Sequence, residues 1–193
     1  MPWEKSYNEA EVLDRAMQAF WAHGYEATSM RDLVTATGIN RGSIYAAFTD
    51  KRTLFVRALH HYDKHHRTDF LAGIEKRHRP AEAIAAAFDE VIAAALEGSG
   101  RKGCLLVNTA LELSPHDPEI DRIVRDSLTA LELFFRAMIE RGQQDGSIRS
   151  DLHAARTAQA LLGLFLGLRV LTRSRPEKAL LESIGKQARA MLQ

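Results

Sequence analysis

Two groups of residues in this chain have the types and spacing to do chemistry with a partner. Residues 40–45 read Asn-Arg-Gly-Ser-Ile-Tyr, with the arginine at the expected start of a short helix. A guanidinium can donate two parallel hydrogen bonds to one guanine edge or to a phosphate. Cys104, the single cysteine, follows Arg101 and Lys102, and neighbouring cations favour the reactive thiolate form. The first group predicts a nucleic-acid contact and the second a reactive thiol.

Composition and motif content narrow the classes of protein that this chain can be. The 193 residues carry a formal net charge of +1, which says little because local patches can hide inside a neutral total. We find no GxSxG elbow, Walker loop, HExxH motif or paired-carboxylate pattern, so a helical enzyme is the weaker alternative. A single cysteine fits a reducing cytosol, and the longest apolar run, Ala160–Leu168, is far shorter than the roughly 20 residues of a membrane span. We therefore expect a cytoplasmic protein without a membrane segment, metal or cofactor.

Apolar residues recur at helical spacing along almost the whole chain, which predicts an all-α fold. The abundance of Ala, Leu, Glu and Arg, with only five prolines, agrees with this prediction. Glycine or proline turns separate the segments, and no internal repeat interrupts them. The helices are expected at about 8–23, 28–38, 40–48, 50–67, 81–97, 103–113, 119–142, 152–173 and 177–192.

The second and third of these helices are joined by a tight turn at Gly38, which is the helix-turn-helix layout. Ile39, Ile44 and Phe48 can pack inward, which leaves the polar side of residues 40–47 facing out. In this layout the later helix enters the DNA major groove while the earlier helix crosses the backbone. The predicted DNA contacts are Thr28, Ser29, Arg31, Asn40, Arg41, Gly42, Ser43, Tyr45 and Lys51.

Charge in this segment supports a DNA contact. Arg41 is expected to read a base, and Tyr45 and Lys51 are expected to hold phosphates. From Arg31 to Arg57 the chain has five basic residues (31, 41, 51, 52 and 57) and two acids (32 and 50), an excess of three. A structural DNA-binding protein without sequence preference is the alternative, and the sequence is compatible with repression or activation.

The helix expected at 152–173 has Gln159 and Arg169 as the only polar residues of its central stretch. A helix so apolar must be buried on nearly all sides, and in a chain this short a second subunit would supply part of that cover. Gly163 and Gly167 would let a neighbouring helix approach closely; the alternative is that these helices only close the protomer's own core. A dimer should bind a pseudo-palindromic operator. The expected dimer contacts are Leu164, Leu168, Leu180, Ile184, Ala188 and Met191.

Cys104, Asn108 and Glu112 share one helical face and could place polar groups in an otherwise apolar pocket. We expect a small effector that is largely apolar or electrophilic. A buried hydrophobe is the competing role for the cysteine, and core packing is the competing role for the aromatic residues. The residues expected at the pocket are Phe88, Cys104, Asn108, Leu131, Phe134 and Phe165.

Four histidines, at 60, 61, 65 and 66, lie on the helix expected at 50–67. His61 and His65 are one turn apart and could share a metal with Asp69. No cysteine pair or HExxH motif supports such a site, so a solvated helix face is the favoured interpretation.

Residues 20–59 carry a set of characteristic residues in one register: Phe20, Gly24, Tyr25, Thr28, Leu33, Gly38, Ile39, Gly42, Ser43, Ile44, Tyr45, Phe48, Lys51 and Leu54. In this pattern the segment resembles the N-terminal DNA-binding domain of the TetR family of bacterial transcriptional repressors. The resemblance implies about nine helices, a homodimer through the last two, and a C-terminal effector pocket whose occupation moves the fourth helix. We therefore expect a helix-turn-helix domain at 1–49, a linking helix at 50–67 and an effector-binding and dimerisation domain at 68–193.

The sequence departs from the family's pattern at two places. Ala46 and Ala47 stand where many members have an aromatic residue or a histidine, which limits these positions to apolar contact. Arg52 replaces the acid that commonly follows the lysine. This change removes a capping-box partner for Thr49 and is expected to add positive charge near the phosphates.

Overall fold

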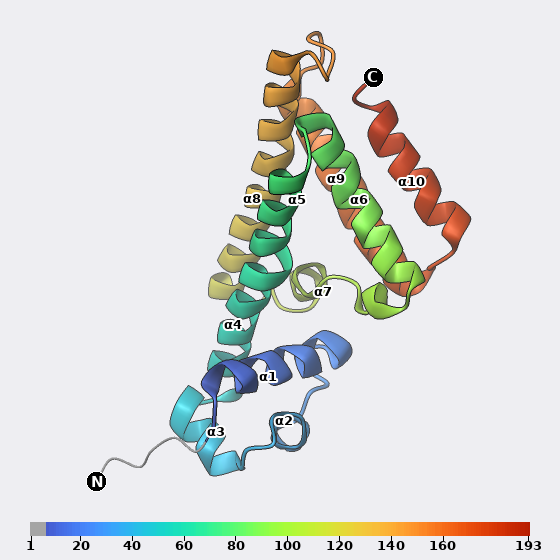
Figure 1. Ribbon diagram of the computed structural model, residues 1–193. Coiled ribbons are helices and arrows are strands. Elements are labelled where there is room, and N and C mark those ends of the chain that lie inside the picture. Colours follow the sequence, from blue (N-terminus) through green and yellow to red (C-terminus); the bar gives the residue numbers. More distant parts are fainter. Residues whose placement is uncertain (1–6) are drawn as a thin grey trace.

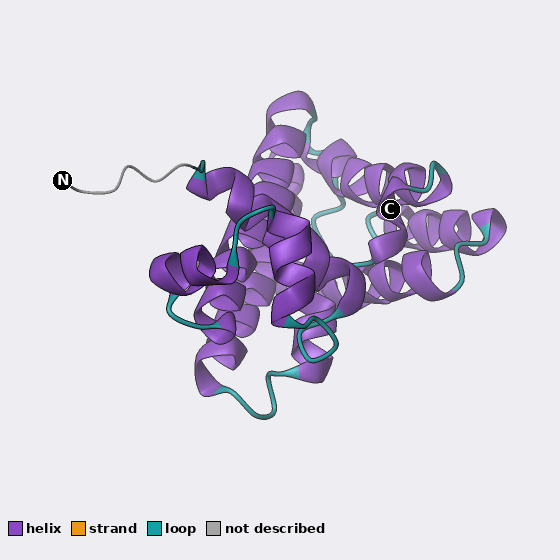
Figure 2. Ribbon diagram, turned by 90° about the horizontal axis from the view of Figure 1, so that it is seen from below, coloured by secondary structure: helices purple, strands orange, loops and turns teal. Residues whose placement is uncertain are grey.

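The computed structural model describes residues 7–193, apart from the side chains of Ser99 and Arg101, and its regular structure is helical throughout that range (Figures 1 and 2). One long rod is built from α4 (Lys51–Tyr62), the π-helical η1 (Asp63–Thr68) and α5 (Asp69–Arg77), so this range contains nine α-helical rods, as expected. The other elements are α1 (Glu9–His23), α2 (Met30–Thr37), α3 (Arg41–Phe48), α6 (Pro80–Leu96), the 3₁₀ turn η2 (Ser99–Lys102), α7 (Leu105–Glu112), α8 (Pro118–Asp145), α9 (Ala154–Ser174) and α10 (Lys178–Ala190).

Local side-chain caps fix the ends of the two short N-terminal helices. Ser29 and Asp32 form a reciprocal capping box at the start of α2, and the Asn40 side chain accepts the backbone N–H of Ser43 at 2.8 Å at the start of α3. Gly38 ends α2 with a φ of 73°, a left-handed conformation that favours glycine. These caps orient α3 against α2.

The start of α4 differs from the expectation for Thr49. Thr49 ends α3 with a φ of 65°, and Asp50 caps α4 by accepting the backbone N–H of Thr53 at 2.6 Å. Asp50 therefore satisfies the helix terminus, so the expected loss of a capping partner for Thr49 was wrong.

The helices fall into a small lower module and a larger upper bundle (Figure 1). Helices α1 and α3 pack against the lower end of α4, α2 packs against α1 and α3, and the rod α4–α5 rises from this module beside α8. In the upper part α8 packs against α6 and α9, and α10 packs on α6 and α9. The long rod therefore links the module that carries α3 to the upper bundle.

Two clusters of buried apolar side chains hold these parts together. The first spans α1, α3 and α4 through residues such as Phe20, Ile44 and Phe55, and continues into α7 and the first turns of α8. The second fills the upper bundle around Phe88 and Phe135. Because the first cluster contains residues of α7 and α8, the lower module and the upper bundle share apolar packing.

Helix α9 is long and apolar enough to cross a bilayer by length and composition alone, with a mean hydropathy of 1.3 over 18 residues. The sequence expectation considered only the uninterrupted apolar run at 160–168, which is shorter. Only 22% of the 18-residue window is buried within the single chain. An apolar helix with an open face is also typical of a subunit interface.

Candidate DNA interface and effector cavity

Helix α3 is amphipathic, with a buried apolar face and an exposed face on the opposite side. Ile44 and Phe48 are fully buried, while Arg41, Tyr45 and Ala46 are exposed. The Arg41 guanidinium donates to the Tyr45 hydroxyl at 3.1 Å and lies 5.4 Å from the ring centroid. Tyr45, one turn along, therefore holds Arg41 along the outer face of the helix, a contact that the sequence analysis did not anticipate.

Lys51 is placed by the packing of Tyr25. Its ammonium lies 4.2 Å from the centroid of the Tyr25 ring, which itself packs against Phe20 and Phe55 in the core. A cation over an aromatic face is attracted by about 0.5–1 kcal/mol at an exposed site. Lys51 is therefore fixed at the N-terminal end of α4, next to the end of α3.

The remaining predicted DNA contacts divide between surface and interior. Thr28 is fully buried and its hydroxyl donates to the Gly24 carbonyl at 2.5 Å, so this side chain shapes the turn before α2 and is not available to DNA. The spacing of Thr28 from α2 matched a DNA contact, but its hydroxyl is used locally. Five others lie at the starts of α2 and α3, with Ser43 partly buried and the rest exposed: Ser29, Arg31, Asn40, Gly42 and Ser43.

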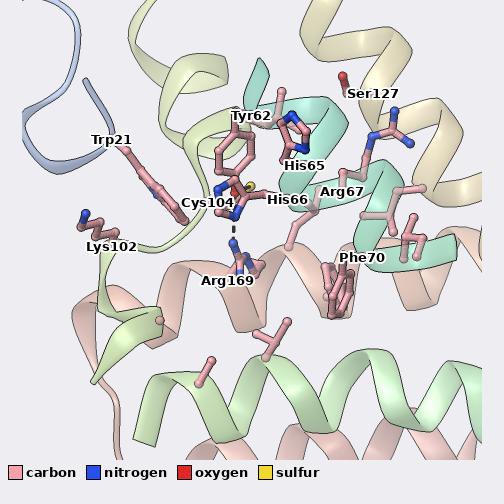
Figure 3. A pocket seen from close by; sticks show the side chains of 18 of the residues that line it. Trp21, Tyr62, His65, His66, Arg67, Phe70, Lys102, Cys104, Ser127 and Arg169 are labelled. Atoms are coloured by element: carbon pink, nitrogen blue, oxygen red, sulfur yellow. Dashed lines mark hydrogen bonds between the residues drawn. The ribbon is translucent and has the colours of Figure 1, made fainter. Parts of the chain in front are cut away.

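A cavity of about 730 Å³ lies between the upper bundle and α1 of the lower module (Figure 3). Side chains of α1, of the rod α4–α5, and of α6, α7, α8 and α9 line it, and Arg169 projects from α9 towards Tyr62 and Cys104. Arg169 donates to the Tyr62 hydroxyl at 3.1 Å, and that hydroxyl donates to the Cys104 sulfur at 3.5 Å. Burial raises the pKa of Tyr62, so its hydroxyl stays protonated.

Some of the residues expected at the pocket line the cavity, and the others lie outside its lining. Cys104, Leu131 and Phe165 line the cavity. Phe88 is fully buried in the upper core and is not part of the wall, and Phe134 packs edge-on against its neighbour Phe135. Asn108 also lies outside the lining, and its side-chain amide nitrogen is buried without a hydrogen-bond partner. The cavity therefore lies nearer to the linking rod than the sequence positions suggested.

Cys104 is the residue just before α7, and its side chain is 9% exposed. Lys102, one of the cations expected beside the thiol, instead donates to Gln18 at 2.6 Å and lies 5.6 Å from the Trp21 ring centroid. The side chain of Arg101 is outside the described part. Among the described residues, Arg169 is the cation linked to the thiol. It is distant in sequence and donates to the same Tyr62 hydroxyl that donates to the Cys104 sulfur.

The histidines of the linking rod contact side chains of the rod itself and of α1. His65 contacts Asp69 at 2.9 Å, and its ring packs against His61. His66 stacks on Tyr62, and its pKa is lowered by burial and by the nearby Arg169. Among residues 7–193, no group of three or more His, Cys, Asp or Glu side chains is placed to hold a metal ion.

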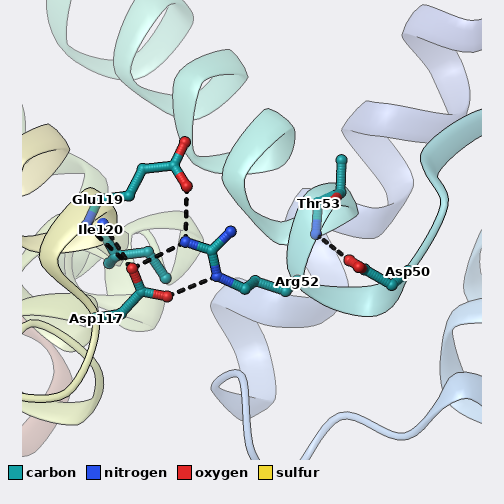
Figure 4. Close-up of polar contacts among 6 residues, drawn as sticks. All are labelled: Asp50, Arg52, Thr53, Asp117, Glu119 and Ile120. Carbon is teal, nitrogen blue, oxygen red and sulfur yellow. Dashed lines mark hydrogen bonds and ion pairs between the residues drawn. The ribbon is translucent and has the colours of Figure 1, made fainter.

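One polar contact between the lower module and the upper bundle is made by Arg52. Arg52 donates to Asp117 at 2.7 and 2.9 Å and to Glu119 at 2.7 Å (Figure 4). The hydrogen bonds from Arg52 lower the pKa of Asp117 to about 2. The positive charge of Arg52, expected near the phosphates, is therefore balanced by the carboxylates of Asp117, the N-cap of α8, and of Glu119 in its first turn.

Another polar contact between these two parts is made by Glu112 at the end of α7. Its carboxylate accepts the backbone N–H groups of Tyr25 at 3.1 Å and Glu26 at 2.8 Å. Gly24 has a φ of 86°, and a Cβ at this position would lie 3.0 Å from the Glu112 carboxylate. The sequence placed Glu112 on the pocket face, whereas the structure places it on the turn that precedes α2.

The outer face of α9 and α10 is open in the single chain. Gly163 and Gly167 are exposed, with no atom within 4 Å of an added Cβ, and Val170 is 45% exposed. Leu168 and Ala188 are fully buried, because the helical period turns them to the protomer's own core, so they do not belong to this face. The other expected dimer contacts are partly buried: Leu164, Leu180, Ile184 and Met191.

Comparison with known proteins identifies the family of this chain. Residues 12–58 match the family model described as bacterial regulatory proteins, tetR family, and residues 80–186 match the tetracyclin repressor-like C-terminal domain. The HTH-type transcriptional regulator YezE of Bacillus subtilis is 33% identical over 147 residues, covering 76% of each chain. The repressor ComR of Escherichia coli is 29% identical over 170 residues, covering 88% of this chain and 81% of its own.

Solved structures agree with this assignment. The regulator CifR, as a cysteine mutant bound to a 26-bp operator duplex, superposes with a TM-score of 0.86 at 27% identity and covers 97% of this chain and 98% of its own. Both the α1–α3 module and the upper bundle are therefore shared with a DNA-binding regulator. The chain belongs to the TetR family and is a DNA-binding transcriptional regulator, not an enzyme.

Proposed function

We propose that this protein is a ligand-responsive repressor that acts in the cytoplasm and binds a pseudo-palindromic operator as a homodimer. The observation that carries the proposal is the exposed, pre-positioned Arg41 on α3, held by Tyr45 at 3.1 Å. ComR is named a repressor, and the CifR complex contains operator DNA, which supports the same role here. In this proposal 1–49 binds DNA, 50–67 links, and 68–193 binds the effector and the second subunit.

Three cations are available for DNA on the lower module. Arg31, Arg41 and Lys51 form no ion pair among the described residues, whereas Arg52 and Arg57 are paired with carboxylates. Arg41 would read a base edge near the start of α3, and Arg31 and Lys51 would hold phosphates. A gel shift with DNA from immediately upstream of the gene, competed with random duplex, tests this function. Competition by random DNA at equal concentration would favour the structural DNA-binding alternative.

The homodimer is proposed to form through the open face of α9 and α10. Gly163 and Gly167 leave room for a partner helix, and the apolar surface between them and Val170 needs cover. A leucine at Gly167 has space within the single chain but would collide with a partner helix. Sedimentation should show a dimer for the parent and a monomer for Gly167→Leu, with Ala72→Leu on the exposed side of α5 as the control. A dimeric Gly167→Leu protein would refute this interface.

The effector is proposed to occupy the cavity beneath the linking rod. The thiol of Cys104 lines this cavity, so an electrophilic effector that reacts with it is a second candidate. Labelling of the native protein with a thiol reagent tests that candidate. No modification under native conditions, or release from operator DNA of a Cys104→Ser variant by the same electrophile, would exclude it.

A further inference from the structure

The polar end of the cavity is formed by hydrogen-bond donors. Arg169 and Lys102 both line it, and neither forms an ion pair with a carboxylate of the described residues. Arg169 donates to the Tyr62 hydroxyl, and Lys102 donates to the Gln18 side chain. The indole N–H of Trp21, another wall residue, is buried without a hydrogen-bond partner. This end therefore has more donors than acceptors.

The acidic side chains of the cavity do not supply the missing negative charge. Asp69 contacts His65 at 2.9 Å, and Glu90 accepts from Arg77 at 2.7 Å. The third cation of the lining, Arg67, is already held by Asp63 through two hydrogen bonds of 2.5 and 2.7 Å. A cation within apolar walls is unfavourable without a counter-charge, so Arg169 and Lys102 leave room for an anion.

The rest of the cavity is apolar. Figure 3 shows Trp21 and Lys102 on one side of Arg169 and Phe70 on the other. Further apolar walls come from α8 and α9, at Leu131 and Phe165. A volume of about 730 Å³ is within the range of small-molecule sites, and such sites combine apolar walls with a few polar groups that fix orientation. The ligand should therefore have one polar end and one apolar end.

We propose that the cavity binds a carboxylate with an apolar tail, with its charged end on Arg169 and Lys102 and its tail against Phe70, Leu131 and Phe165. The planar guanidinium matches the two oxygens of a carboxylate, and the Tyr62 hydroxyl keeps it in place. The inference rests on the proposed effector function and narrows the effector from an apolar or electrophilic molecule to an amphipathic acid.

The test is isothermal titration calorimetry without DNA, using octanoate, decanoate and dodecanoate, each compared with the alcohol of the same chain length. The acids should bind the parent more tightly than the alcohols. Arg169→Met should weaken acid binding by about 10–100-fold, the range of hydrogen bonds to charged groups, and leave alcohol binding unchanged. Lys102→Met should weaken acid binding by a smaller factor, because its side chain is engaged with Gln18.

Two controls keep the result interpretable. Arg156→Met removes an exposed arginine from the first turn of the same helix and should bind acids as the parent does. In a Trp3→Phe background, Trp21 is the single indole, so quenching or a spectral shift on adding decanoate locates the ligand at this wall. A variant with the same thermal unfolding midpoint as the parent is taken as folded. If Arg169→Met does not fold, the effect of Lys102→Met on acid binding tests the inference.

The outcomes separate this inference from the proposed function. If no acid in the series binds better than its alcohol, or if neither substitution affects acid binding, the inference is wrong. Absence of operator binding would refute the repressor function, while the calorimetric result would still stand because it is measured without DNA.

Discussion

The DNA-facing surface and the cavity both present cations that lack a carboxylate partner, but in opposite surroundings. On the lower module Arg31 and Arg41 are exposed to solvent, where binding to phosphates is weakened by salt. In the cavity Arg169 is partly buried among apolar walls, where screening is weaker and one matching anion is selected. Arginine can thus bind DNA at the exposed site and a small anion in the cavity.

Two further arginines differ from these cations because they are paired with carboxylates. Arg52 and Arg57 lie on α4 and are engaged by carboxylates, so they contribute less to either site. Arg52 joins α4 to the first turn of α8, and Glu112 joins α7 to the turn before α2. Motion of the upper bundle would therefore strain contacts that orient α2 and α4.

The largest expected effect concerns the core behind the cavity. Phe88 is fully buried, so Phe88→Ala should lower the free energy of unfolding by about 3–5 kcal/mol through the cavity that it leaves. Denaturant unfolding measures this loss, with Leu133→Ala, at a residue 54% exposed, as the control expected to change little. A Phe88→Ala protein as stable as the parent would place Phe88 at a solvent-filled pocket, as the sequence first suggested.

The next effect concerns the DNA-facing cations. Arg41→Ala should weaken operator binding by about 1–3 kcal/mol and relax the preference at one base pair. Lys51→Ala should weaken all sequences alike and reduce the slope of log K against log salt by about 1. Fluorescence anisotropy with operator and mutated duplexes at several salt concentrations separates the two roles. If Arg41→Ala kept the full base preference of the parent, Arg41 would not read bases.

The smallest effect concerns the contact between α4 and α8. The pKa of Asp117 is about 2 in the folded protein, below its ordinary value of 3.8, so the pair stabilises the fold above pH 4 and this contribution is lost as the pH falls towards 2. Arg52→Gln should lower the free energy of unfolding by at most about 1 kcal/mol at pH 7, because Arg52 is 43% exposed.

Denaturant unfolding of Arg52→Gln and parent across this pH range measures the difference. It should shrink on acidification, and a difference that stays constant from pH 7 to pH 2 would show that Asp117 does not titrate with this contact.

The sequence predicted the fold class and the helix-turn-helix because those depend on periodicity and on neighbouring residues. Gly38 and the Asn40 cap act within a few positions of α3, so their roles were readable locally. The polar end of the cavity was not predicted, since Trp21, Tyr62 and Arg169 meet only after α1, α4 and α9 pack together. Arg169 itself was noted only as an interruption of an apolar helix, although a lone charge in such a helix is a usable signal of a buried site.

Similar limits explain the other differences. Thr28 occupies a position typical of a DNA contact, but its hydroxyl is used by the Gly24 carbonyl four residues earlier. Arg52 was assigned to phosphates from its place in a basic segment, and its carboxylate partners lie 65 and 67 residues further along the chain. Local charge counts do not include such long-range pairing.

Sequence-specific DNA binding through α3 is tested by selecting duplexes from a random DNA library with the purified parent protein. We expect enrichment of one inverted repeat, bound about 10³-fold or more tightly than random duplex at physiological salt, and a relaxed preference at one base pair of that repeat for Arg41→Ala. If the parent enriched no sequence and bound all duplexes alike, sequence-specific regulation through α3 would be contradicted.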